Sequence, residues 1–201
     1  RRVKRFEIQH AIGVMLHVLD ALGAAHRAGV VHRDMKPENV IVTSGPGGEP
    51  WAKVIDFGIA RVISTGVALP RQTAVGTLIG TPDYLSPEQA RGEQDIDART
   101  DIYSVGVMLF ELLTGKTPFE GITALEIAER VLTNAFPSPR SLNASVSVEL
   151  EQFILKATAY RREDRYATAR EFVDALRPFK GESVTVRVLA DDDPDELEEN
   201  N

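Results

Sequence analysis

The feature of this sequence that most constrains its fold is the stretch 101–114, which would be apolar on nearly every side of a helix. A helix with one apolar stripe lies at the surface of a domain, whereas a helix that is apolar all round has to be enclosed by other elements. The stretch therefore predicts a buried helix at the centre of a helical domain. Its apolar residues are Ile102, Val105, Val107, Met108, Leu109, Phe110, Leu112 and Leu113.

Further helices are predicted on both sides of this central one. From Ile8 to Leu22 apolar residues recur at steps of three and four, the pattern of a helix that buries one face. We expect this helix to end near Gly29. Two more amphipathic helices are expected over residues 148–159 and 167–176.

One short β-hairpin and one long loop interrupt the helices. Residues 40–42 and 52–55 are short apolar runs, and the segment 44–48 between them reads Ser-Gly-Pro-Gly-Gly, which favours a turn. Residues 57–89 are rich in Gly, Thr and Pro and show no periodicity, so they predict a long loop. Such loops inside a compact domain are usually functional. The predicted fold class is therefore mainly α with a short β-hairpin.

Composition excludes several classes of function. The chain of 201 residues has no cysteine, which excludes disulfides, thiolate zinc sites and cysteine nucleophiles. Its net charge of −7 resides in the last dozen residues, so the remainder is formally neutral and offers no basic field for nucleic acid. We expect one domain over residues 1–180 and an acidic, disordered tail over 181–201. No apolar run is expected to span or contact a membrane, and a cytoplasmic location is expected.

Three short motifs follow one another in a defined order. Residues 32–39 read His-Arg-Asp-Met-Lys-Pro-Glu-Asn, residues 56–58 read Asp-Phe-Gly, and residues 86–88 read Ser-Pro-Glu. Together they resemble the catalytic loop, the metal-binding loop and the end of the activation segment of protein kinases. The resemblance covers residues 6–178. The run Ser-Pro-Glu-Gln-Ala-Arg-Gly at 86–92 looks most like bacterial members of the eukaryotic-type, or Hanks-type, serine/threonine kinases.

This resemblance implies a catalytic role for five residues. Asp34 would accept the proton of the substrate hydroxyl, and Lys36 would stabilise the transferring phosphate of ATP. Asn39 and Asp56 would bind Mg²⁺, which prefers oxygen ligands. Thr81 would hydrogen-bond both Asp34 and Lys36. The alternative for the two aspartates is that they cap turns, but turn capping does not explain why both occur in motif order with Asn39.

Other matching positions would support the site without reacting. Glu88 would pair with a buried Arg165, and breaking such a pair is costly. Asp101 would hold the backbone of the catalytic loop, a role that is compatible with capping the central helix. The remaining supporting positions in the first two motifs are His32, Phe57 and Gly58.

Arg33 suggests regulation by phosphorylation. Family members with an arginine beside the catalytic aspartate are often activated when a phosphate on the activation loop binds a basic cluster. Thr73 and Thr77 are the candidate phosphate acceptors here. The alternative is that both are ordinary polar loop residues.

The N-terminal segments with which a kinase binds the nucleotide phosphates are not found in this sequence. A glycine-rich loop, a strand lysine and a helix glutamate should come before the catalytic loop, but the 31 residues before His32 predict one helix. We therefore expect the C-terminal lobe (C-lobe) only, as a fragment of a longer kinase or as a truncated protein. Its partners would be a protein substrate and the missing N-terminal lobe (N-lobe).

Two functions remain open. The first is an ATP- and Mg²⁺-dependent serine/threonine protein kinase. It would be active in the full-length parent protein, which could be anchored in a membrane. The chain of 201 residues alone would be inactive. The second is a non-catalytic docking module. The presence of Asp34, Asn39 and Asp56 together favours the enzyme, because a lobe released from catalysis has no need of all three.

Overall fold

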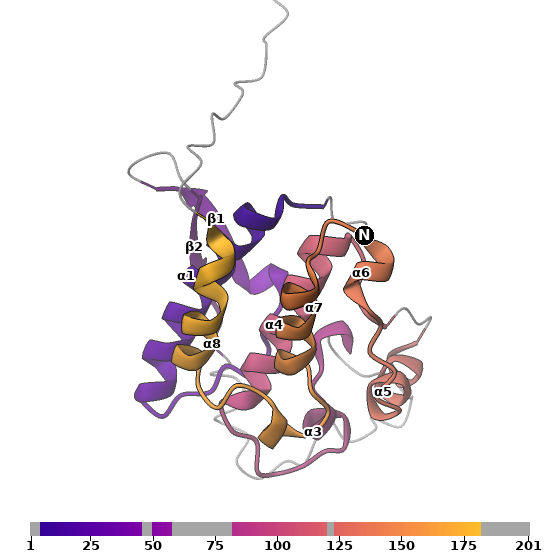
Figure 1. Cartoon of the computed structure of the whole chain (residues 1–201). Coiled ribbons are helices and arrows are strands. Elements are labelled where there is room, and N and C mark those ends of the chain that lie inside the picture. Colours follow the sequence, from indigo (N-terminus) through magenta and orange to yellow (C-terminus); the bar gives the residue numbers. More distant parts are fainter. Residues whose placement is uncertain (1–4, 46–49, 58–81, 120–122, 182–201) are drawn as a thin grey trace, which may run out of the picture.

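Helix α4 (Arg99–Thr114) lies at the centre of the fold, surrounded by other helices (Figure 1). The structure is a computed structural model that describes residues 5–45, 50–57, 82–119 and 123–181. All residues of α4 except Arg99 and Leu112 are buried, as its all-round apolar pattern predicts. Helices α1 (Ile8–Arg27), α6 (Pro139–Leu142) and α7 (Val148–Ala157) contact α4.

A glycine lets α4 and α7 approach closely. A β-carbon added at Gly106 would lie 2.7 Å from Cγ2 of Thr158 and 3.0 Å from Cβ of Ala157, so a larger residue would push the two segments apart. A second glycine, Gly115, ends α4: it has a φ of 75° and donates its backbone N–H to the oxygen of Glu111 at 2.7 Å. The close packing of α4 on α7 and the end of α4 therefore each depend on a glycine.

Helix α1 is a core helix of this domain. It packs against α4, against α8 (Ala169–Leu176) and against the second strand, and Ile12, Leu19 and Leu22 are fully buried. By length and mean hydropathy alone this helix could cross a membrane, a test that buried core helices also pass. Half of the apolar window is buried inside the domain, which accounts for its hydrophobicity.

The end of the predicted long loop is ordered, which corrects the expectation of irregular structure up to residue 89. A short helical turn, η2 (Pro82–Tyr84), leads into helix α3 (Pro87–Ala90). Ser86 caps α3, and the side chain of Gln89 accepts the backbone N–H of Ser86, so the two form a capping box. A serine followed three residues later by glutamine was the sequence signal for this helix start.

Three further helices begin with side-chain caps. Thr123, Ser147 and Thr168 each accept a hydrogen bond at the start of α5, α7 and α8, respectively. Helices α7 and α8 begin and end within two residues of the predicted ranges. The other elements are α5 (Ala124–Leu132), η1 (Pro37–Asn39), η3 (Arg162–Asp164) and η4 (Arg177–Lys180).

The strands β1 (Val40–Ser44) and β2 (Pro50–Val54) pair antiparallel, with Val40 opposite Val54 and Val42 opposite Ala52. β2 lies against α1: the side chain of Ala52 is buried, and its backbone N–H donates to Nδ1 of His17 at 3.4 Å. The expected acidic tail falls almost wholly in residues 182–201, outside the described residues.

Candidate active site

The catalytic loop is held in place by a buried aspartate in the first turn of α4. Both carboxylate oxygens of Asp101 accept backbone hydrogen bonds, Oδ2 from His32 at 2.9 Å and Oδ1 from Arg33 at 2.8 Å. Asp101 is fully buried, so these bonds compensate the removal of its charge from water. The residue expected to hold the loop thus lies directly beneath it.

Arg33 is forced into an unusual backbone conformation. Its φ is 64°, in the left-handed region, which costs a non-glycine residue roughly 1–2 kcal/mol. Its N–H is held by Asp101, and its carbonyl oxygen accepts a hydrogen bond from Nε2 of Gln89 at 2.7 Å. The peptide bond that leads into Asp34 is therefore constrained by helices α3 and α4 together.

His26, at the end of α1, is a further part of this network that sequence reasoning missed. Its Nε2 lies 2.7 Å from Oδ2 of Asp101. A carboxylate only accepts hydrogen bonds, so this contact requires a proton on Nε2 of His26 and thereby orients the imidazole ring. Its Nδ1 is buried without a hydrogen-bond partner among the described residues. The only signal in the sequence was a histidine in the last turn of a helix that leads into the motif.

Asp34 presents its carboxylate to solvent next to a lysine. Nζ of Lys36 lies 2.9 Å from Oδ2 of Asp34, and the side chains are 19% and 46% exposed, respectively. The buried Asn39 donates its Nδ2 to the backbone oxygen of Asp34 at 2.6 Å. This leaves the Oδ1 atom of Asn39 as an oxygen donor for a ligand. An acceptor, a cation and an amide oxygen are thus gathered within six residues.

The hairpin brings Asp56 to the same place. Asn39 directly precedes β1, Asp56 follows β2, and the pairing of Val40 with Val54 puts these two strand ends side by side. The backbone N–H of Ile55 donates to the oxygen of Asn39 at 2.9 Å. Residues 17 positions apart are therefore neighbours at the open end of the sheet.

His32 contacts both the catalytic loop and the metal-binding loop. Its Nε2 lies 3.0 Å from the backbone oxygen of Ile55, and its ring contacts that of Phe57 with centroids 4.9 Å apart. Its Nδ1 accepts the backbone N–H of Asp34 at 3.3 Å. His32 is fully buried, so it acts as a structural link between the loops.

The donor set of this site fits a magnesium ion. An amide oxygen from Asn39 and a carboxylate from Asp56 are hard oxygen ligands, and Mg²⁺ is typically held by one or two such groups together with phosphate oxygens and water. Among the described residues no cluster of three or more His, Cys, Asp or Glu could hold a metal by itself. Four of the predicted site positions lie outside the described residues: Gly58, Thr73, Thr77 and Thr81.

The expected pair of Glu88 and Arg165 is present and buried. Two hydrogen bonds of 2.8 Å join the guanidinium to both carboxylate oxygens, with side-chain exposures of 2% and 0%. Arg165 also donates to the backbone oxygens of Ala159, Tyr160 and Arg99. Burial alone would raise the pKa of Glu88, but the hydrogen bonds and charge of Arg165 outweigh it, and the pKa is lowered. The pair anchors α3 below the catalytic loop.

A second anchor of the same segment was not predicted. The hydroxyl of Tyr84 donates to Oε2 of Glu111 on α4 at 2.5 Å, and its backbone oxygen accepts from Oγ of Ser104 at 2.9 Å. Burial raises the pKa of Tyr84 and that of Glu111. The tyrosine therefore keeps its proton and acts as a donor. Neither residue had a local sequence signal for this contact.

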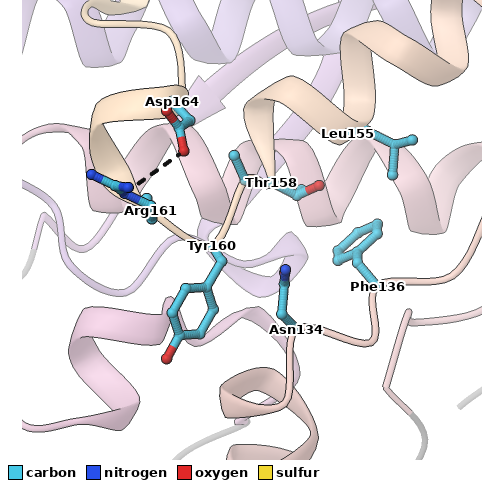
Figure 2. A pocket seen from close by; sticks show the side chains of 8 residues that line it. Asn134, Phe136, Leu155, Thr158, Tyr160, Arg161 and Asp164 are labelled. Atoms are coloured by element: carbon cyan, nitrogen blue, oxygen red, sulfur yellow. Dashed lines mark ion pairs between the residues drawn. The ribbon is translucent and has the colours of Figure 1, made fainter.

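A cavity of about 430 Å³ lies elsewhere, between the segment after α5 and the end of α7 (Figure 2). None of the predicted site residues lines it, so the candidate active site rests on the catalytic-loop geometry. At one end of the cavity, Arg161 and Asp164 form an ion pair, with Nε and Oδ2 3.9 Å apart. The lining residues are Asn134, Phe136, Leu155, Thr158, Ala159, Tyr160, Arg161 and Asp164.

Comparison with known proteins agrees with this geometry. The family model described as the protein kinase domain matches residues 1–175. The chain belongs to the protein kinase family. It is 42% identical over 177 residues to the serine/threonine-protein kinase Pkn1 of Myxococcus xanthus, covering 87% of this chain and 25% of Pkn1. It is also 40% identical over 188 residues to PknB of Mycobacterium leprae, covering 92% of this chain and 29% of PknB.

The fold is that of a solved kinase domain. The crystal structure of a double mutant of the PknI kinase domain from Mycobacterium tuberculosis matches with a TM-score of 0.64 and 23% identity, covering 90% of this chain and 58% of that one. The resemblance to bacterial Hanks-type kinases is thereby confirmed. The chain spans about a quarter to three tenths of the length of the curated relatives named here.

Proposed function

We propose that this chain is the C-lobe of a serine/threonine protein kinase that transfers the γ-phosphate of ATP to Ser or Thr hydroxyls of proteins. The observation that carries the proposal is the convergence of Asp34, Lys36, Asn39 and Asp56 at the open end of the hairpin. Phosphoryl transfer needs a proton acceptor, a cation and oxygen ligands for a metal in one place. The two loops supply each of these from motif positions.

In this mechanism Asp34 orients the substrate hydroxyl and accepts its proton as the oxygen attacks the γ-phosphorus and ADP leaves. Its 46% exposure leaves the carboxylate accessible to a protein substrate. Lys36 stays beside it as a fixed positive charge for the transferring phosphate. Asn39 and Asp56 would hold Mg²⁺, which supplies positive charge to the phosphate oxygens.

The remaining nucleotide contacts would come from an N-lobe. Residues 1–201 contain no glycine-rich loop followed by a strand lysine. The hairpin exposes three large apolar side chains, Ile41, Val42 and Trp51, each more than 40% accessible. Apolar surface gathered on one element is typical of an interface, and the two proposed metal ligands flank this element in the sequence. The N-lobe would cover the hairpin and close over the nucleotide.

A non-catalytic docking module is the second candidate. The cavity near α7 is the feature that favours it, because it provides a concave surface away from the catalytic loop. The complete set of polar groups around Asp34 favours the enzyme. A docking surface does not require a buried aspartate that holds the loop in a strained conformation.

The proposal is tested with two substitutions in the intact kinase that carries this chain. Asp34→Asn should lower kcat by about 10²–10⁴-fold, the usual contribution of a general base, while the KM for ATP stays nearly constant. Asp56→Asn should lower kcat and also raise the Mg²⁺ concentration needed for half-maximal rate. Asp174→Asn, at an exposed position on α8, is the matched control and should leave both constants unchanged. Mild and equal effects of the first two substitutions would contradict the assigned roles.

A further inference from the structure

Gln89 is a buried polar residue that the catalytic mechanism above does not use. It lies in α3, is 5% exposed, and uses both ends of its side-chain amide. Its Oε1 accepts from the backbone N–H of Ser86 at 3.1 Å and from the Ser86 hydroxyl at 3.2 Å. Its Nε2 donates to the carbonyl oxygen of Arg33 at 2.7 Å. The amide therefore bridges two segments that are 56 positions apart in the chain.

The orientation of this amide is set by its partners. The Arg33 carbonyl is only an acceptor and the Ser86 N–H is only a donor, so a flipped amide would oppose like groups at both ends. The hydroxyl of Ser86 is itself held, 2.7 Å from Oγ1 of the buried Thr100. Gln89 is thus a rigid donor aimed at one carbonyl.

That carbonyl belongs to the peptide bond from which Asp34 extends. Arg33 has a φ of 64°, and Asp101 holds its N–H at 2.8 Å. The carbonyl at the other end of the residue is held by Gln89. A strained residue keeps its conformation only where its surroundings over-determine it. Together the two contacts fix the plane of the Arg33–Asp34 peptide and hence the direction of the Asp34 side chain.

We propose that Gln89 is a positioning residue for Asp34, and that through it the end of the activation segment sets the geometry of the proton acceptor. The proposal rests on the proposed kinase function. It follows from the place of α3, which comes after η2 at the end of the activation segment and is anchored by Glu88 to Arg165. A shift of α3 moves the Gln89 amide, and the amide carries the Arg33 carbonyl with it.

Two substitutions separate this role from general stability. Gln89→Met keeps the size of the side chain and removes the donor, and Gln89→Glu keeps an acceptor for Ser86 while placing a carboxylate against the Arg33 carbonyl. In the intact kinase both should lower kcat roughly 10–100-fold, the scale expected when a catalytic group is displaced by about 1 Å. The KM values for ATP and for the protein substrate should change less than about twofold, because neither ligand touches Gln89.

Thr114→Val is the control for a structural effect. It removes hydrogen bonds from Oγ1 of the buried Thr114 to the backbone oxygens of Phe110 and Lys116 at the C-terminal end of α4, outside the Gln89 network, so it should lower Tm and leave kcat close to that of the parent. Far-ultraviolet circular dichroism and the unfolding midpoint show whether the Gln89 variants are folded. If one of them does not fold, the other carries the test.

A double-mutant cycle with Asp34→Asn decides the question. If Gln89 acts through Asp34, Gln89→Met should cost less than about twofold in the residual rate of the Asp34→Asn enzyme. Equal losses in both backgrounds, or a kcat for both Gln89 variants equal to that of the parent, would overturn the positioning role while the kinase function stands. A fully active Asp34→Asn enzyme would instead refute the proposed function, and with it a role of Gln89 through Asp34.

Discussion

Strained backbone marks the candidate site at the scale of single residues. Among the described residues, the non-glycine residues with positive φ are Arg33 at 64°, Asp56 at 54° and Asn134 at 54°. The first directly precedes the proposed proton acceptor, and the second is a proposed metal ligand. Residues in this region persist only where neighbouring contacts hold them. Asn134, which lines the separate cavity, belongs to a residue type that tolerates this conformation well.

The side chain of Arg33 leads to a prediction about regulation. Thr73 and Thr77 lie outside the described residues, between the metal-binding motif and η2 in the sequence. A phosphate there would bring about −1.5 to −2 charge, which a cluster containing Arg33 would bind. The intact kinase should therefore phosphorylate itself at one or both threonines. Replacing both with Ala should lower activity at least about fivefold without unfolding the enzyme, since a phosphate that orders the loop contributes 1–3 charge-assisted hydrogen bonds.

The control for this prediction uses other hydroxyls of the same loop. Replacing Ser64 and Thr65 with Ala should leave activity unchanged. These residues follow the metal-binding turn closely in the sequence, so they are not candidate phosphate acceptors. Mass spectrometry of the active enzyme locates the phosphates. If Thr73 and Thr77 are unmodified and the double Ala variant is as fast as the parent, Arg33 serves only to hold the catalytic loop.

At the scale of elements, the short helix α3 is the piece on which the site depends most. It is anchored three times: through Glu88 to Arg165, through the preceding Tyr84 to Glu111 on α4, and through Gln89 to Arg33. A helix of this length has no stability of its own, because so few backbone bonds do not offset the cost of nucleation. Its position is therefore set entirely by tertiary contacts.

Removing one anchor should destabilise the domain. Glu88→Gln leaves the charge of Arg165 buried without its partner, a change that typically costs about 3–5 kcal/mol. Because the pKa of Glu88 is lowered below its ordinary value of 4.5 in the folded protein, the contribution of its charge is present above that pH. It is lost as the pH falls through the lowered pKa.

Urea unfolding at several pH values measures this effect. The difference in the free energy of unfolding between parent and Glu88→Gln should be largest near pH 7 and should shrink on the acid side of pH 4.5. Glu163→Gln is the control, because the pair of Glu163 with Arg161 is exposed to solvent and contributes little. A difference between parent and Glu88→Gln that is independent of pH would contradict the ionic account of the pair.

At the scale of the whole molecule, the described residues form one side of the proposed site. The proposed proton acceptor and the two proposed metal ligands lie on the two motif loops, and the hairpin beside them exposes apolar side chains. A nucleotide held from this side alone would lack the lysine and glycine-rich loop that orient its phosphates. We therefore expect the proposed site to need a second lobe over the nucleotide.

Residues 1–201 expressed alone should therefore transfer no detectable phosphate from ATP to protein. Loss of a single donor that stabilises a transition state commonly costs about 10²–10³ in rate, and several such contacts are missing here together. Radiolabelled transfer assays and calorimetry with ATP and Mg²⁺ provide the measurement, with the intact kinase as the positive control. Micromolar binding of ATP by residues 1–201 would contradict the need for a second lobe.

The local pattern of this sequence is enough to predict the helices that bury a face, the hairpin and the order of the catalytic motifs. Periodicity reports burial because each helical turn repeats the same neighbours, which is why α1, α4, α7 and α8 were predicted close to their observed bounds. The motifs also indicated Asp34, Asn39 and Asp56, and the pairing of the strands explains why they meet. None of this requires knowledge of contacts between distant segments.

Only the tertiary structure decided how the catalytic loop is held. His26 and Asp101 are 75 positions apart, and Gln89 and Arg33 are 56 apart, so no periodicity links them. The positive φ of Arg33 is likewise not encoded by the residue itself, because arginine disfavours this region. It results from hydrogen bonds donated and accepted by two helices that meet beneath the loop. Local propensity determined which elements form, whereas their packing determined the strained conformation of Arg33, which positions the proposed proton acceptor.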